Sequence, residues 1–249
     1  MKKHLLAVAI TTAFLPSIGQ TDTFLGIYAG AGVWQQEYTG DIETFGTTVN
    51  VEQALGLDDE TGTVLWAALE HPIPFLPNIR ISSIELSTTG EGIIQQSFTF
   101  DNQVYDVGVT TLTQLDLDHN EITLYYEILD NWVNLDLGIT VKIFDGALEI
   151  QGGGENGNVD LDEPIPMLYG RAAFELPLTG LRLDVEGSVI SFDDNSLYDV
   201  SAEIAYETFI GLGAELGYRA IEADVSEFSD DLTVDTSFRG PYFNVYYHF

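Results

Sequence analysis

The sequence predicts an all-β fold: an antiparallel, up-and-down transmembrane β-barrel of about ten strands. Three observations support this prediction: alternating segments of about ten residues, a C-terminal segment with one wholly apolar face, and a signal-peptide pattern at the N-terminus. No later segment is apolar over the roughly 20 residues that a spanning helix needs. A chain that enters a membrane without such helices must do so as closed strands, because only then are all its backbone groups paired.

The N-terminal pattern is that of a secretory signal peptide. The basic start Met1-Lys2-Lys3 precedes an apolar run over residues 5–15, and the small residues Ser17 and Gly19 fit cleavage after Gly19. The apolar run is too short to span a membrane as a helix. We therefore predict that residues 1–19 are removed.

Composition limits the classes of function. The chain has no cysteine, which excludes a disulfide framework and thiol chemistry. Its formal charge is −32, and loss of Lys2 and Lys3 with the signal peptide changes this to −34. Such a charge excludes nucleic acid as a partner, because phosphate binding needs clustered Lys and Arg. With no composition break or linker, residues 20–249 are predicted to form one domain.

Alternation within each strand indicates which face points inward. In residues 181–190, Leu183 and Val185 share one face and Arg182 and Asp184 share the other. A charged residue facing lipid costs up to about 2–4 kcal/mol at the membrane midplane, so the charged face must line the interior. Eight and twelve strands are the alternatives to ten. The ten predicted strands are residues 23–36, 62–71, 78–89, 112–129, 132–151, 165–176, 181–192, 198–208, 211–225 and 233–249.

The connections between these strands alternate in length, as the short periplasmic turns and longer extracellular loops of membrane barrels do. This alternation predicts both termini on the periplasmic side. Slips in side-chain parity near Ser82-Ser83 and near His119-Asn120 predict β-bulges, and residues 93–109 are interpreted as a strand extension beyond the membrane. The predicted short connections are residues 71–77, 130–131, 177–180 and 208–211, and the long ones are 37–61, 91–111, 152–163, 193–197 and 226–232.

The predicted inward positions hold more acids than bases. Unpaired charges in a narrow interior are costly, so mutual pairing across neighbouring strands is the expected role of these residues. The excess of carboxylates would favour cations over anions in any open channel. The predicted lumen charge network consists of Asp136, Lys142, Arg171, Glu175, Arg182, Asp184, Glu186, Glu203, Glu207, Glu215 and Arg219.

Two segments of the mature chain are the most distinctive: the last strand and an internal hairpin. The last strand has an apolar face made of Phe243, Val245, Tyr247 and Phe249. Residues 124–138 form two alternating strands that meet at a turn of Asp and Asn, residues that tolerate turn dihedrals.

With the signal peptide, these segments resemble a family of small, uncharacterised proteobacterial outer-membrane β-barrel proteins. The resemblance implies a location in the Gram-negative outer membrane and contact with its lipid and lipopolysaccharide. It also implies insertion by the barrel assembly machinery, with Phe243, Val245, Tyr247 and Phe249 as the assembly signal. The family carries no activity that could be transferred to residues of this chain.

A search for catalytic chemistry finds one candidate. Ten-stranded barrels include outer-membrane proteases, and slightly larger barrels include phospholipases. These enzymes resemble each other in needing a histidine near the active carboxylate or serine. His119 is expected near the outer leaflet, whereas His71 and His248 are expected on the periplasmic side. A site needs nucleophile, base and orienting group together, and the sequence has no nucleophile elbow, zinc-ligand spacing or phosphate-binding glycine loop. We therefore predict no catalytic, cofactor or metal site.

Acidic clusters are interpreted as solvated loops. None matches the twelve-residue calcium loop with its central Gly and terminal Glu. An alternative hypothesis is weak binding of divalent cations, which would bridge these carboxylates to lipopolysaccharide phosphates. The clusters are Asp58-Asp59-Glu60, Asp116/Asp118/Glu121, Asp160/Asp162/Glu163, Asp193-Asp194 and Asp230-Asp231/Asp235.

The sequence thus predicts a non-enzymatic outer-membrane barrel, either structural or a narrow, cation-favouring, porin-like pore. Ten strands lie close to the eight that leave an interior just filled by side chains. Two alternatives remain open. One is an outer-membrane hydrolase with an extracellular-side site around His119. The other is a soluble periplasmic β-sandwich binding module, whose strands would also alternate but would bury their apolar face.

Overall fold

The computed structural model describes residues 25–229 and 232–249. The predicted signal peptide lies outside the described residues. The regular elements in the described part of the chain are all β-strands. Among these residues, no helix is long and apolar enough to cross a membrane.

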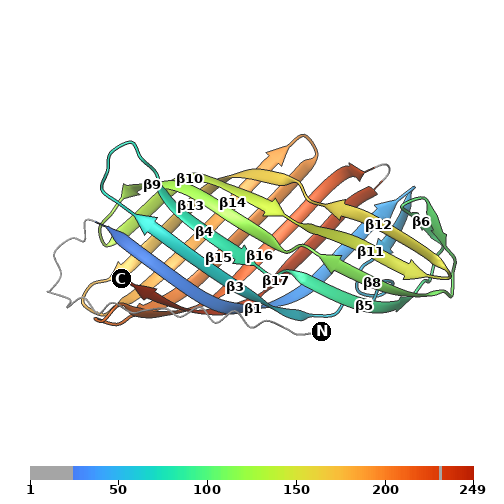
Figure 1. Cartoon of the computed structure of the whole chain (residues 1–249), viewed down its shortest axis with the longest axis horizontal. Helices are drawn as coiled ribbons and strands as arrows, with labels where there is room; N and C mark the ends of the chain where they lie inside the picture. Colours follow the sequence, from blue (N-terminus) through green and yellow to red (C-terminus); the bar gives the residue numbers. More distant parts are fainter. Residues whose placement is uncertain (1–24, 230–231) are drawn as a thin grey trace, which may run out of the picture.

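Ten strands close into one antiparallel barrel (Figure 1). Each strand pairs with the next, and the last strand pairs with the first from Tyr28↔His248 to Thr44↔Leu232. The ring therefore has no free edge, which confirms the ten-stranded barrel and shows that the β-sandwich alternative was wrong. In order, the barrel strands are β1 (Gly26–Thr44), β3 (Glu60–Glu70), β4 (Asn78–Ile84), β9 (His119–Leu129), β10 (Val133–Phe144), β13 (Pro164–Leu176), β14 (Leu181–Phe192), β15 (Asn195–Glu207), β16 (Leu212–Ser229) and β17 (Leu232–His248).

Side-chain direction follows the predicted alternation. Leu65, Ile139 and Leu216 are exposed on the outside of the barrel. Asp184 and Lys142 are buried inside it. The barrel wall beside the charged interior is therefore inverted relative to a soluble protein: apolar side chains cover its outside, and charged side chains face inward. Soluble monomers rarely expose contiguous apolar patches larger than a few hundred Å².

One end of the barrel carries the short turns and the other carries a β-structured lobe. In the lobe, a second sheet has the order β12-β11-β8-β5, and a hairpin, β6-β7, lies beside it. The short strand β2 pairs with the end of β1. The lobe strands are β2 (Thr47–Asn50), β5 (Ser87–Ile93), β6 (Phe98–Phe100), β7 (Gln103–Tyr105), β8 (Thr110–Asp116), β11 (Gly146–Gly152) and β12 (Glu155–Leu161).

The lobe corrects several predicted boundaries. The long connections predicted at residues 37–61, 91–111 and 152–163 contain strands, and the one predicted at 193–197 shrinks to a tight turn between β14 and β15. The short connections lie where they were predicted. Conversely, the single strands predicted at 78–89, 112–129 and 132–151 are each divided in two, because they leave the barrel and continue in the separate sheet of the lobe.

The two predicted bulges were misplaced by a few residues. The β4–β9 ladder runs without a shift through Ser82↔Glu121 and Ser83↔Asn120. The interruptions fall instead between β4 and β5 and between β8 and β9. There the Leu86 N–H donates to Asp118 Oδ1 at 2.7 Å, so a side chain replaces a ladder bond at the point where the sheet divides. A shift that was not predicted lies at Leu135/Asp136.

The interior changes character along the barrel axis. The half near the short turns holds charged side chains, whereas the half near the lobe is filled by an apolar plug. We define the apolar plug as Tyr38, Ile84, Met167, Leu197, Ile221 and Phe238, all buried inside the barrel. The plug is continuous with the core of the lobe, which includes Ile42, Leu55, Phe98, Phe100, Tyr105 and Ile150.

Candidate functional site

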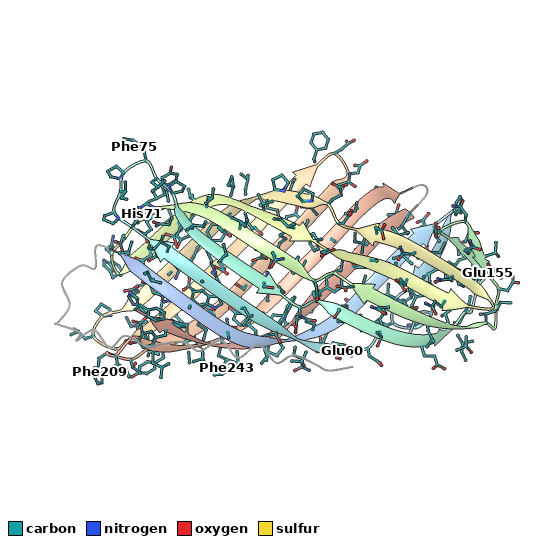
Figure 2. The ribbon with its side chains drawn as sticks, viewed as in Figure 1. Glu60, His71, Phe75, Glu155, Phe209 and Phe243 are labelled. Atoms are coloured by element: carbon teal, nitrogen blue, oxygen red, sulfur yellow. The ribbon has the colours of Figure 1, made fainter. Side chains whose placement is uncertain are left out.

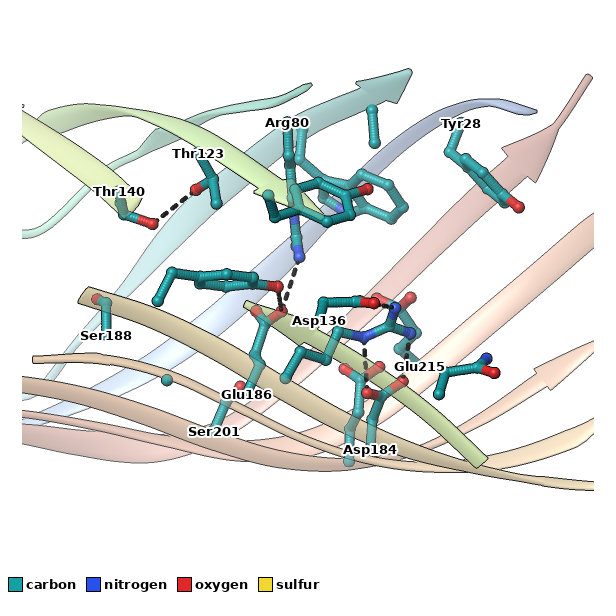
Figure 3. Close-up of a pocket in the computed structure, with 18 of the residues that line it drawn as sticks. Tyr28, Arg80, Thr123, Asp136, Thr140, Asp184, Glu186, Ser188, Ser201 and Glu215 are labelled. Atoms are coloured by element: carbon teal, nitrogen blue, oxygen red, sulfur yellow. Dashed lines mark hydrogen bonds and ion pairs between the residues drawn. The ribbon is translucent and has the colours of Figure 1, made fainter. Parts of the chain in front are cut away.

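A polar cavity occupies the charged half of the barrel (Figure 3). Its volume is about 230 Å³. Its lining begins at the short-turn end with Glu70, Asp130 and Glu175, and it ends in mid-barrel at Asp199 and Arg219. The apolar plug lies beyond this last level, so the cavity is blind toward the lobe.

The floor of the cavity is a buried cluster of two bases and two acids. Lys142 Nζ donates to Asp199 Oδ2 at 2.6 Å and also to Glu121. Arg219 bonds both oxygens of Asp199, at 2.8 and 2.5 Å, and Glu121 at 3.0 Å. Its guanidinium also lies 5.3 Å from the ring centre of Trp34. The four side chains come from β9, β10, β15 and β16, so the cluster joins opposite parts of the ring.

A second cluster lies closer to the short-turn end. Arg171 forms a bidentate pair with Asp184, with both contacts at 2.8 Å, and its third contact is Asp136 at 3.1 Å. Arg182 Nε donates to Asp184 Oδ2 at 2.5 Å. Its terminal nitrogen lies 3.6 Å from both Glu203 and Glu215. Bidentate arginine pairs of this kind are among the stronger ionic contacts in proteins.

Arg80 crosses the cavity to a distant strand. Its guanidinium donates to Glu186 Oε2 at 2.9 Å, and Tyr169 donates to the same oxygen at 3.2 Å (Figure 3). The guanidinium also lies 4.8 Å from the Trp66 ring centre. This contact is a cation–π interaction within the interior.

The structure places all but two of the predicted network residues in these ionic contacts. Glu175 is exposed at the mouth and accepts from Asn134 at 3.0 Å rather than from a base. Glu207 lies at the same end, where it contacts His248 at 3.2 Å and accepts from Tyr246 at 3.0 Å.

Sequence reasoning missed three members of the network: Arg80, Glu121 and Asp199. Asp199 could have been found, because it has the same parity as Glu203 on β15. Arg80 and Glu121 were hidden by the bulges wrongly expected at Ser82-Ser83 and His119-Asn120, since a misplaced bulge inverts the assigned face.

His119, the candidate catalytic histidine, is buried beside the cavity floor. Its Nδ1 lies 2.9 Å from the Leu117 carbonyl oxygen, and its ring lies 4.7 Å from that of Phe144. Its Nε2 lies 3.4 Å from Glu121 Oε1. The side chain is fully buried rather than open to the lobe surface, where the hydrolase hypothesis required it.

The acidic clusters do not gather into a metal centre. Over residues 25–229 and 232–249, no three His, Cys, Asp or Glu side chains are arranged to hold a metal ion. The cluster predicted at Asp116, Asp118 and Glu121 is split. Glu121 faces the lumen, whereas Asp118 accepts a hydrogen bond from the Leu86 N–H. Partial burial raises the pKa of Asp118, and the neighbouring carboxylates of Asp116 and Glu85 raise it further. The hydrogen bond from the Leu86 N–H acts in the opposite direction and lowers this pKa. The cluster at Asp230-Asp231 lies outside the described residues.

The predicted assembly strand has the expected facing. Phe243, Val245, Tyr247 and Phe249 are exposed on the outside of the barrel. The intervening His248 points inward and stacks on Tyr28 with the ring centres 4.1 Å apart. The Phe249 N–H donates to the Ile27 carbonyl at 2.9 Å, which extends the barrel seam to the last residue.

Comparison with known proteins identifies the fold and no activity. No protein-family model and no curated protein matches the chain. Its structure is similar to that of the outer membrane protease OmpT from Escherichia coli, with a TM-score of 0.55 and 10% identity over 90% of this chain and 97% of that one. A FadL homologue from Pseudomonas aeruginosa gives a TM-score of 0.36 at 9% identity, over 92% of this chain and 65% of that one. The chain therefore has the closed-barrel fold of an outer-membrane protein, and the resemblance to the small proteobacterial family remains a prediction.

Proposed function

We propose that this protein is a non-enzymatic, structural barrel of the Gram-negative outer membrane, with a closed interior. The single observation that carries the proposal is the sequence of layers along the axis: an open mouth, a paired charge network, an apolar plug and a folded lobe. On this proposal the barrel holds the lobe at the cell surface and does not conduct solutes.

The apolar belt supports the membrane location. In water an exposed belt of Leu, Ile, Val and aromatic side chains would drive aggregation, whereas in lipid it is the required surface. The short-turn end is also apolar at its tips: Phe75 is 95% exposed and Phe209 is 99% exposed, and both point away from the barrel (Figure 2). By the usual rule for such barrels, we place the short turns and both termini in the periplasm and the lobe outside.

Two features favour a structural barrel over the narrow cation-favouring pore. The charges nearest the plug are bonded to one another, which leaves no unpaired ring of carboxylates at the floor of the cavity. Beyond them, the plug presents aliphatic and aromatic side chains, and its one hydroxyl, that of Tyr38, already donates to Gln36 Oε1 at 2.9 Å. Crossing such a segment would strip the ion of its water without replacement, and this is very costly.

The hydrolase alternative would need substrate access to His119 from the lobe side. Its burial between Phe144 and the floor cluster supports the non-enzymatic proposal. As partners we propose outer-membrane lipid, lipopolysaccharide and the barrel assembly machinery. Weak divalent-cation bridging at the acidic loops is a further proposal.

Planar-bilayer recordings on the refolded protein test the closed interior. We expect no steady conductance, and any brief openings should be cation-selective because acids outnumber bases in the cavity lining. A 16-stranded porin in the same bilayers is the positive control, because barrels of that size leave a water channel. Large, steady or anion-selective channels would overturn the proposal.

A further inference from the structure

The mouth of the cavity carries a one-sided excess of negative charge. Glu70, Glu127, Asp130, Asp136 and Glu175 all line it, from β3, β9, β10, β13 and the turn between β9 and β10. Asp136 forms an ion pair with Arg171. Among the described residues, the other four carboxylates form no ion pair. The mouth thus differs from the floor, where acids and bases are matched.

Two of these acids oppose each other directly. Glu127 on β9 is the register partner of Asp136 on β10, at the point where the ladder shifts. Like charges in directly opposed positions destabilise a pair of strands. Asp136 is also 1% exposed, and its Oδ1 has no hydrogen-bond partner although the side chain lines the cavity. A buried carboxylate oxygen without a donor is rare in a folded protein.

The walls beside these acids are aromatic. Tyr28, Trp66, Tyr125 and Tyr246 line the same cavity. Tyr125 donates to Glu70 Oε1 at 2.8 Å, so a ring and a carboxylate are joined at the mouth. Trp66 and Tyr246 lie with their ring centres 5.9 Å apart. Aromatic faces attract organic cations, and they also pack against the methylene groups between two charges.

We propose that the mouth is a binding site for a small, linear organic polycation, of the aliphatic di- or triamine class. Separate ammonium groups would pair with the separated carboxylates, and one would donate to Asp136 Oδ1. A single metal ion fits less well, because the acids of the described residues are not grouped to coordinate one. The cavity is also smaller than those that hold drug-sized ligands, which measure about 300–1,000 Å³.

Because the cavity is blind, the amine would be bound rather than transported. Only the entry of the amine from the periplasm rests on the proposed function, because the proposed function places the short-turn end of the barrel in the periplasm. Binding by the purified protein depends on the cavity alone. A conducting barrel would thus overturn the proposed function and leave the amine site to be judged separately.

Isothermal titration of the refolded full barrel in detergent tests the site, with spermidine, putrescine and magnesium chloride at matched ionic strength. We expect saturable spermidine binding that Glu127→Gln and Glu70→Gln each weaken by roughly tenfold, the size expected for one charge-assisted contact. Glu155→Gln is the matched control, because Glu155 is exposed at the far end of the lobe (Figure 2). It should bind spermidine as the unaltered protein does.

Each variant is also run unboiled on a detergent gel. A variant that keeps the mobility of the folded barrel but binds spermidine more weakly has lost the site and not the fold. Three results would overturn the proposal: no saturable amine binding, equal weakening by Glu155→Gln, or magnesium binding as tightly as spermidine at the same residues. The second would mean diffuse attraction to an acidic protein, and the third would mean a simple counterion site.

Discussion

At the scale of single residues, Lys142 is the side chain on which the interior depends most. It is buried without exposed surface, and it bonds two acids that lie on different strands. Removal of such a side chain leaves buried negative charges without the positive charge that balances them. The cost of these unbalanced charges exceeds the net stabilisation that the intact pair provides.

We therefore expect Lys142→Ala to lower the free energy of unfolding by about 3–5 kcal/mol, measured from urea transitions of the refolded barrel. Arg239→Ala is the matched control. Its side chain is 44% exposed and lies 3.8 Å from the exposed Glu222, so its loss should cost at most about 1 kcal/mol. Equal shifts for the two variants would show that the floor cluster does not stabilise the barrel.

At the scale of elements, β17 has two different faces with separate roles. Its outward residues form part of the apolar belt, whereas its inward residues bond to acids of the two strands that follow it in the ring, β16 and β15. Tyr242 donates to Glu203 at 2.5 Å, and Asn244 donates to Glu215 at 2.9 Å. The inward face therefore stabilises the folded barrel, and we propose that the outward face is the one that the assembly machinery recognises.

Phe249→Ser should thus reduce the amount of protein inserted in the outer membrane more than His248→Ser does. His248→Ser should insert but unfold at lower temperature, because it loses stacking on Tyr28 worth about 0.5–1.5 kcal/mol and the contact with Glu207. Membrane yield and thermal unfolding of the inserted protein measure the two effects. Equal yields would contradict the assigned roles of the two faces.

At the scale of the whole molecule, closure of the ring predicts unusual resistance to detergent. Every barrel strand has a partner on both sides, so no edge is free to open first. The protein should fractionate with the outer membrane, begin near Gln20, and migrate faster on a detergent gel when unboiled than when boiled. Recovery in the soluble periplasmic fraction, or one mobility in both samples, would refute the membrane proposal.

The sequence by itself determined the number of barrel strands and, for most of them, the face that points inward. The alternation of side chains has a period of two, so charges such as Asp184 and Arg171 could be assigned inward from local pattern alone. The same rule gave the outward face of β17. The rule failed near Arg80 and Glu121, because a local pattern does not locate the residue at which a strand leaves the barrel.

Only the tertiary structure decided which charges meet and where the interior closes. Arg80 and Glu186 are 106 residues apart, and Arg219 and Glu121 are 98 apart. Their contacts depend on the register of every ladder around the ring, which no single segment encodes. The plug and the blind cavity likewise arise because the barrel and the lobe share one core. The physical reason is that these contacts join strands that become neighbours, or face each other, only after the ring has closed.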